Sequence, residues 1–251
     1  MKTKSWITTK FIAHRGLFDN VTLPENSLAA FENAAQNGFA IELDVQLTKD
    51  NVLVVFHDDT LERMTNIAGV VEQMTYEQIK DATLLDTNCK IPTFAEVLDL
   101  VDGRTEILVE IKPYNNAGTI EQAVATMLDE YKGKFAIESF NPKIVRWFKK
   151  NRPSYQCGLL ASECKGVPIP AYQRFAIKNL LLWRWCGCKF VAYDVNSVAK
   201  IKKVKRLRKH MPVVCWTLTT QAQYEQTKQH YDNIIFDSFV PVDTTCKEMK
   251  T

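Results

Sequence analysis

The chain has 251 residues, a net charge of +3 and a hydrophobic fraction of 46%. This length is typical of one large α/β barrel, and the apolar fraction is sufficient for a core without disulfides or structural metals. The small net charge gives no reason to expect a nucleic acid partner, and no uncharged apolar run is long enough to span a bilayer, so we expect no stable membrane insertion.

The amino-terminal segment predicts no export. Residues 1–10 contain a single apolar pair, which is shorter than the apolar stretch of a signal peptide, so we expect a cytoplasmic protein. The seven cysteines are odd in number, which is typical of reduced thiols. The close pair Cys186-Gly187-Cys188 lacks the two-residue spacer of zinc and redox motifs, and we interpret these cysteines as buried thiols.

Short β-branched or aromatic runs alternate with amphipathic runs of about ten residues, a pattern typical of repeated βα units. The predicted strands are residues 11–14, 41–45, 52–57, 107–112, 135–140, 156–160, 190–194, 213–217 and 233–236. The predicted helices are residues 27–37, 94–101, 120–131, 142–150, 172–182, 197–209 and 221–230. No linker-like segment divides the series, so residues 1–251 are predicted to form a single domain.

The second and third predicted strands are too close together for a crossover helix. A tight turn at Asp50-Asn51 predicts an antiparallel hairpin, in which Asp44 lies opposite His57. The remaining eight strands are the number that closes a (β/α)8 TIM barrel. The segment of about 58–92, with one short helix over 76–82, is predicted to be a small insertion beside the barrel mouth.

Polar residues at strand ends are the first candidates for chemistry, because such barrels place their catalytic groups there. The first strand ends in His14-Arg15. A histidine can transfer protons and an arginine can bind phosphate through two hydrogen bonds, although the same pair also occurs in capping and packing.

Two further strands carry acids on one face. Glu42 and Asp44 are two residues apart, as are Glu110 and Lys112, so each pair projects to a common side of its strand. Carboxylates buried together repel each other unless a cation or a proton neutralises them, which favours a metal site. The alternative is one acid paired with a Lys or Arg and the other solvated. Three carboxylates suit Mg²⁺ or Ca²⁺ better than zinc.

The two histidines, three acids, arginine and lysine together fit phosphoryl chemistry, with the imidazoles as base and acid. No nucleophile elbow, Walker loop or dinucleotide fingerprint competes with this interpretation. A basic run over residues 200–209 places Ile201, Val204 and Leu207 on one helix face. Its cations either form a solvated face or attract anionic lipid or a charged substrate.

At this point the sequence resembles the glycerophosphodiester phosphodiesterase family. The shared motifs are His14-Arg15-Gly16, Pro24-Glu25-Asn26-Ser27, Ala30-Phe31, Glu42-x-Asp44-Val45, Thr48-Lys49-Asp50, His57-Asp58, Leu61-x-Arg63, Glu110-x-Lys112, Ser139-Phe140 and Trp216-Thr217. They occur in the family's order over nearly the whole chain. Relatives often have an Asn shortly after the Trp-Thr pair and a Thr-Asp at the last strand, where this chain has Leu218-Thr219-Thr220 and Phe236-Asp237.

The resemblance implies a (β/α)8 barrel in which Glu42, Asp44 and Glu110 hold Ca²⁺ or Mg²⁺. It implies that His14 and His57 act as general base and acid, in an order that stays open.

The resemblance also implies that Arg15 and Lys112 bind the phosphate and that Glu25 supports the site. Phe140 and Trp216 are then expected to line the glycerol or alcohol side, although a strand Trp is commonly a packing residue.

The leading prediction is therefore hydrolysis of a small-molecule glycerophosphodiester to sn-glycerol 3-phosphate and an alcohol. The attacking group is either water or the substrate's own glycerol 2-hydroxyl. A first alternative is a related barrel with phospholipase C or D-type activity on membrane phospholipid, favoured by the basic run and by the apolar residues 180–183. A second is a barrel that binds phosphate or metal without catalysis. The alcohol group and the oligomeric state are not predicted.

Overall fold

The structure is a computed structural model that describes residues 5–112 and 118–242. The strands are β1 (Ile12–Ala13), β2 (Ala40–Leu47), β3 (Leu53–Val55), β4 (Ile107–Ile111), β5 (Phe135–Ser139), β6 (Cys157–Ala161), β7 (Phe190–Asp194), β8 (Val213–Leu218) and β9 (Asn233–Phe236). The α-helices are α1 (Leu28–Gln36), α2 (Tyr76–Ile79), α3 (Phe94–Val101), α4 (Thr119–Glu130), α5 (Pro142–Asn151), α6 (Ala171–Lys178), α7 (Trp183–Cys186), α8 (Val195–Val198), α9 (Lys202–Leu207) and α10 (Gln221–Thr227). Short 3₁₀ helices are η1 (Trp6–Thr8), η2 (Val71–Gln73) and η3 (Lys228–His230).

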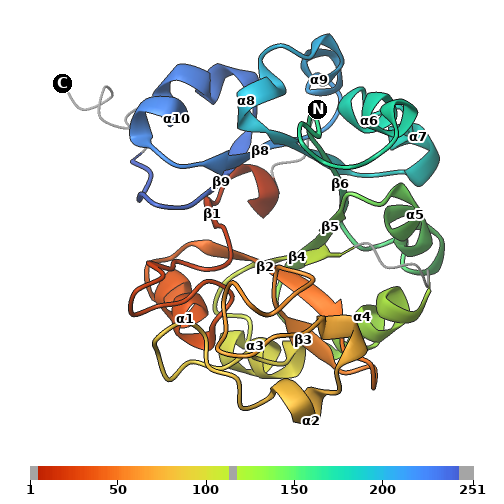
Figure 1. Cartoon of the computed structure of the whole chain (residues 1–251). Coiled ribbons are helices and arrows are strands. Elements are labelled where there is room, and N and C mark those ends of the chain that lie inside the picture. Colours follow the sequence, from red (N-terminus) through yellow and green to blue (C-terminus); the bar gives the residue numbers. More distant parts are fainter. Residues whose placement is uncertain (1–4, 113–117, 243–251) are drawn as a thin grey trace.

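The sheet closes into a barrel. Its parallel strands follow the order β1-β9-β8-β7-β6-β5-β4-β2, and parallel pairing of β1 with β2 completes the ring. The helices lie around the outside of this ring (Figure 1). The predicted (β/α)8 barrel is thus confirmed, and the carboxyl ends of its eight strands meet at one rim because the strands run in the same direction.

Apolar side chains fill both layers of the barrel. Inside the ring, Leu108, Phe190 and Val214 belong to one buried cluster, whereas the larger cluster between strands and helices includes Phe31 and Phe148. The inner cluster fills the barrel beneath the carboxyl ends of the strands, so the polar residues at those ends are supported by close-packed apolar side chains.

The hairpin of β2 and β3 forms, but in a different register from the prediction. Val45 pairs with Val55, so the pairing places Asp44 opposite Phe56 rather than His57, and the Phe56 amide donates to the Asp44 carbonyl at 2.9 Å. Beyond the strand ends the Thr48 amide donates to the Val52 carbonyl at 3.0 Å, which leaves a three-residue loop, 49–51, whose last residue, Asn51, adopts a φ of +62°. A three-residue loop with a left-handed last residue shifts the register by one from that of a two-residue turn.

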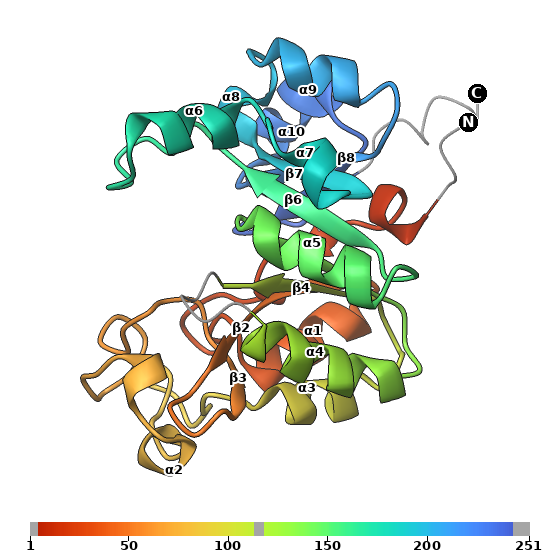
Figure 2. The ribbon, with the colours of Figure 1, turned by 90° about the vertical axis from the view of Figure 1, so that its right-hand side faces the viewer.

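The insertion predicted over about 58–92 lies beside the barrel. Leu61, Val71 and Ile79 pack with Val54 and Phe56 in an apolar cluster of their own. The insertion extends from the molecule on the side towards which the arrow of β6 points (Figure 2). It therefore adjoins the rim where the strands end.

One predicted helix is shorter in the structure, and another is divided in two. The helix predicted over 172–182 corresponds to α6 alone, which ends at Lys178 before Leu180 with its φ of +50°, and α7 begins beyond the predicted range. The helix predicted over 197–209 is α8 and α9, with Ile201 extended before α9. Within residues 5–112 and 118–242, none of the helices combines the length and apolar character needed to cross a membrane.

Candidate active site

The loop after β1 is held close to the barrel rim. The His14 amide donates to the Phe236 carbonyl at 2.9 Å, and the chain then turns through Arg15 and Gly16 with φ values of +54° and +84°. A Cβ on Gly16 would lie 2.9 Å from the backbone carbon of Ala30. Glycine at this position therefore permits both the turn and the close approach to α1.

The three predicted metal ligands lie on the neighbouring strands β2 and β4, within the part of β2 that pairs with β4. Asp44 pairs with Glu110 in the parallel register, and Glu42 precedes Asp44 by two residues on β2. One carboxylate oxygen from each acid lies within 4.8 Å of the others, and all three side chains are buried. Lys112 Nζ lies 2.7 Å from Asp44 Oδ1 and 3.0 Å from Glu110 Oε1. Strand alternation thus brings these four residues together as predicted.

Burial and the mutual repulsion of the three acids shift their pKa values, because the two nearby cations offset only part of the negative charge. Burial raises the pKa of Glu42 well above its ordinary value, and the charges of Asp44 and Glu110 raise it further. Burial also raises the pKa of Glu110, although Lys112 opposes this effect. For Asp44, burial is outweighed by Lys112, His57 and Arg15, which lower its pKa. Three buried carboxyl groups in one place fit a hard divalent cation, because oxygen ligands are those that Ca²⁺ and Mg²⁺ prefer.

A second layer of hydrogen bonds orients these groups. Arg15 donates its backbone N–H to Glu42 at 2.9 Å and its Nη1 to Glu25 at 2.6 Å. Asn26 Nδ2 donates to Asp44 Oδ2 at 2.9 Å, and Arg63 Nη2 donates to Glu25 at 2.6 Å. Burial opposes ionisation of Glu25, but Arg63 and Arg15 outweigh it and lower the pKa of Glu25 to about 2. Glu25 therefore holds Arg15 as a carboxylate.

Arg15 has donor capacity left for an anion. Its Nε is buried and makes no hydrogen bond within the described part of the chain, and it lies 3.6 Å from Asp44 Oδ2. A buried guanidinium donor without an acceptor is costly unless a ligand supplies one.

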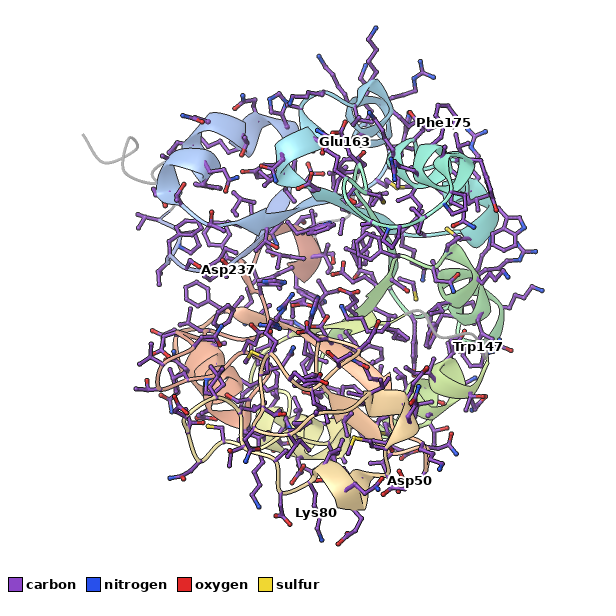
Figure 3. All side chains as sticks on the ribbon, viewed as in Figure 1. Asp50, Lys80, Trp147, Glu163, Phe175 and Asp237 are labelled. Carbon is purple, nitrogen blue, oxygen red and sulfur yellow. The ribbon has the colours of Figure 1, made fainter. Side chains whose placement is uncertain are left out.

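Each of the two candidate catalytic histidines is bound to an aspartate through Nδ1. His14 Nδ1 lies 2.9 Å from Asp237 Oδ2, and His57 Nδ1 lies 2.5 Å from Asp58 Oδ1. Asp58 in turn binds Arg63. A carboxylate at Nδ1 fixes the ring orientation and leaves Nε2 as the nitrogen available for proton transfer. Figure 3 labels Asp237, which directly follows β9.

The pKa of His57 is lowered. Burial is the main cause, and the cations Lys112 and Arg15 add to it, while Asp44 and Asp58 oppose the shift. A neutral imidazole can accept a proton, so this environment keeps His57 in a form that can act as a base.

The two predicted substrate-side aromatics touch each other. The rings of Phe140 and Trp216 are 5.6 Å apart in an edge-to-face arrangement, and both pack against the cluster inside the barrel. Trp216 Nε1 is buried without a hydrogen-bond acceptor among the described residues. Packing and substrate contact are both compatible with this position.

Several site residues were not identified from the sequence alone. Asp237 and Asp58 were noted only within motifs, although acids next to a strand-end histidine and at the last strand end could have indicated imidazole partners. Glu138 was also missed. It lies opposite Glu110 on β5, it is 1% exposed, and its Oε2 makes no hydrogen bond within residues 5–112 and 118–242. A single acid in the run Phe135–Phe140 was the available signal.

The chain is similar in sequence and in fold to known phosphodiesterases. A glycerophosphodiester phosphodiesterase from Caldanaerobacter subterraneus is 39% identical over 185 residues, which cover 65% of this chain and 74% of that protein. One from Bacillus subtilis is 30% identical over 77% of this chain and 78% of that protein. An Oleispira antarctica phosphodiesterase, solved with its product sn-glycerol-3-phosphate, has the same fold, with a TM-score of 0.74 and 21% identity over 91% of this chain and 92% of that one.

The model of the glycerophosphoryl diester phosphodiesterase family matches residues 14–240, a span from the first strand-end histidine to just past β9. That span includes every residue of the cluster described above. The chain therefore belongs to the glycerophosphoryl diester phosphodiesterase family and is an enzyme of that class.

Proposed function

We propose that the chain hydrolyses glycerophosphodiesters to sn-glycerol 3-phosphate and an alcohol, with His14 and His57 as general base and acid, in either order, and a divalent cation at Glu42, Asp44 and Glu110. The observation that carries the proposal is the placement of two aspartate-bound histidines beside a buried three-carboxylate cluster. The product named for the Oleispira antarctica relative supports the substrate class.

The three acids would hold Ca²⁺ or Mg²⁺, which would neutralise charge on the phosphate and lower the pKa of a bound hydroxyl group. The buried carboxylate cluster and the raised pKa values of Glu42 and Glu110 support this assignment.

Arg15 and Lys112 are proposed to bind the phosphate oxygens. The buried Nε of Arg15 makes no hydrogen bond among residues 5–112 and 118–242, and Glu25 holds Nη1 at 2.6 Å, so the guanidinium is fixed with one edge available. Lys112 is proposed to remain a cation at neutral pH, because Asp44 and Glu110 raise its pKa despite burial. Two fixed cations can stabilise the additional negative charge of a phosphoryl transition state.

Proton transfer is assigned to Nε2 of the two histidines. One ring accepts the proton of the attacking hydroxyl group, and the other donates a proton to the oxygen of the departing alcohol. The same roles apply whether water or the glycerol 2-hydroxyl attacks the phosphorus. Phe140 and Trp216 are proposed to contact the organic part of the diester.

We test this with His14→Asn and His57→Asn, assayed on glycerophosphocholine, glycerophosphoethanolamine, glycerophosphoglycerol and glycerophosphoinositol. Each change should lower kcat by roughly 10²–10⁴-fold, because it removes a group that carries a proton. His210→Asn is the matched control, since His210 is exposed and lies outside the site. Undiminished turnover in either site variant would contradict the acid–base assignment.

The metal assignment is tested in the same assay. Chelation should abolish turnover of the wild-type enzyme, and addition of Ca²⁺ or Mg²⁺ should restore it. Activity that persists after exhaustive chelation would refute the metal requirement.

A second candidate, phospholipase C or D-type cleavage, is favoured by exposed aromatic residues in α6, the helix that follows β6. Release of phosphocholine (C-type) or choline (D-type) from phosphatidylcholine micelles, at a rate comparable to hydrolysis of glycerophosphocholine, would favour it. We further propose that residues 1–251 act as one domain on a small-molecule substrate in the cytoplasm. The free thiols at the six described cysteines are compatible with that compartment, and Cys246 lies outside the described residues.

A further inference from the structure

The segment between β6 and α7 extends beyond the barrel at the rim where the strands end. Figure 2 shows α6 and the loop before it projecting on the side towards which β6 points, the side on which the insertion also lies. The first five residues of α6, 171–175, are all exposed, and α6 contains no buried residue. Ile177, near the end of α6, packs against the core, but the core gives no reason for the apolar side chains at the exposed start of the helix.

Three large apolar side chains gather on this projection. Tyr172 is 72% exposed, Phe175 is 61% exposed and Val167, in the loop before α6, is 44% exposed. Figure 3 labels Phe175 at the outer edge of the molecule. We call these three residues the α6 tip. Scattered apolar residues on a surface are ordinary, but three within nine residues on one protruding element form a patch that water solvates poorly.

The loop that carries Val167 is held against α6. Pro168 and Pro170 restrict its backbone, and the Pro170 carbonyl accepts the Arg174 amide at 3.0 Å. Arg174 Nη2 also donates to the Val167 carbonyl at 3.2 Å. The α6 tip is therefore preorganised, and little conformational entropy is lost when it contacts another surface.

The charge around the α6 tip is positive. Residues 162–186 contain four Lys or Arg residues and one acidic residue, and therefore carry a net charge of +3. That acid, Glu163, is bound by Lys165 and Lys178, both at 2.8 Å. Arg174 makes no ion pair with an acid in the described part of the chain. An aromatic tip flanked by cations is complementary to an anionic lipid surface, in which rings enter the interface and cations attract the headgroups.

We propose that the α6 tip docks the enzyme reversibly on anionic phospholipid bilayers, with the barrel mouth directed towards the lipid surface. The occupant is the bilayer itself rather than a single phosphate, because apolar side chains and cations contribute together. The proposal concerns attachment and does not depend on which diester the active site cleaves.

The test is cosedimentation of the full chain with vesicles of phosphatidylcholine alone or with about a third of the lipid as phosphatidylglycerol. The wild-type enzyme should pellet with the anionic vesicles only, and an increase of salt from about 0.1 to 0.5 M should release it, because salt screens exposed charges. Failure to pellet with anionic vesicles would overturn the proposal.

Two variants assign the binding to the α6 tip. Tyr172→Ser combined with Phe175→Ser should lower the partition coefficient by roughly tenfold or more. Arg174→Gln should lower it about fivefold, whereas Lys150→Gln, which removes one exposed cation at the end of α5, should leave it nearly unchanged. Equal losses in the two charge variants would indicate a general charge effect and overturn the assignment.

Thermal unfolding, hydrolysis of soluble diester and light scattering serve as controls. All variants should unfold at the wild-type temperature and hydrolyse soluble glycerophosphocholine at the wild-type rate, because the α6 tip lies outside the catalytic cluster. If the wild-type enzyme lacks hydrolysis but still pellets, only the proposed function fails. If light scattering without vesicles shows a dimer that Tyr172→Ser with Phe175→Ser abolishes, the occupant is a second copy and the lipid proposal is wrong.

Discussion

Glu25 and Glu138 are both buried acids near the barrel rim, yet their surroundings shift their pKa values in opposite directions. Arg63 and Arg15 hydrogen-bond to Glu25 and lower its pKa to about 2 despite burial. For Glu138, burial raises the pKa well above its ordinary value, and the negative charges of Glu110 and Asp44 raise it further. The pH dependence of stability should therefore differ in sign between the two.

Glu25→Gln should destabilise the protein by about 1–3 kcal/mol at pH 7, because it removes the carboxylate that accepts hydrogen bonds from both Arg15 and Arg63. The pKa of Glu25 is lower in the folded than in the unfolded state, so its contribution is present above about pH 4.5 and is lost as the pH falls towards 2. Urea unfolding from pH 7 to pH 3 measures the difference from the wild-type protein. A difference that grows on acidification would contradict the ion-pair assignment.

Glu138→Gln should stabilise the metal-free protein at pH 8 relative to the wild-type protein. The raised pKa of Glu138 means that the folded state keeps a proton that the unfolded state has released, so stability falls as pH rises above about 4.5. The variant should therefore gain in relative stability between pH 5 and pH 8 in urea unfolding with chelator. Glu130→Gln, at an exposed position, is the control and should show no such gain.

At the scale of elements, the connection from β1 to α1 holds the proposed catalytic and metal-binding residues together. Arg15 and Asn26 both adopt positive φ values, 54° and 56°, and the Asn26 amide donates to the Arg15 carbonyl at 2.9 Å. Ser27 then begins α1 by accepting the Ala30 amide at 3.1 Å. The strained backbone is therefore stabilised at both ends by hydrogen bonds, as is common at functional sites.

Gly16→Ala tests this connection against Gly38→Ala. Both glycines have positive φ, but an added Cβ meets the Ala30 backbone at Gly16 and nothing within 4 Å at Gly38. Gly38→Ala should cost about 1 kcal/mol for the backbone conformation, and Gly16→Ala about 2–4 kcal/mol with a loss of activity, because the clash displaces Arg15. Thermal unfolding and kcat measure both effects. Equal costs for the two variants would argue against the close approach.

At the scale of the whole molecule, the barrel concentrates repulsion at one rim. Glu42, Asp44, Glu110 and Glu138 are all buried there, on three adjacent parallel strands. Lys112 and Arg15 neutralise part of this charge. Any ligand cation that binds the folded state alone must therefore stabilise the entire fold.

Addition of Ca²⁺ or Mg²⁺ to the chelated protein should raise the melting temperature. At about 100 to 1,000 times the dissociation constant, the gain is roughly 3–4 kcal/mol. Glu110→Gln should reduce this gain strongly, whereas Glu72→Gln, at an exposed position in the insertion, should retain it. Differential scanning calorimetry with each ion measures the gain, and an equal response in both variants would exclude Glu110 as a ligand.

Much of the fold and of the site was predictable from the sequence. Strand alternation and the alternation of strands with helices predicted the (β/α)8 barrel and the common faces of Glu42 with Asp44 and of Glu110 with Lys112. These features depend on the two-residue period of a strand and on the shared direction of parallel strands, both of which are local or topological rules.

Tertiary structure decided the rest. The hairpin register depended on the left-handed conformation of Asn51, and the early end of α6 on that of Leu180, which local propensity does not determine. The pairing of His14 with Asp237 joins residues 223 positions apart, and Glu138 meets Glu110 only because β5 lies beside β4. The sequence alone determined which groups are candidates for the chemistry and which of them share a strand face, because side-chain identity and the two-residue strand period are local properties. The closed barrel decided the partner and charge state of each group, because both depend on burial and on neighbours distant in the chain.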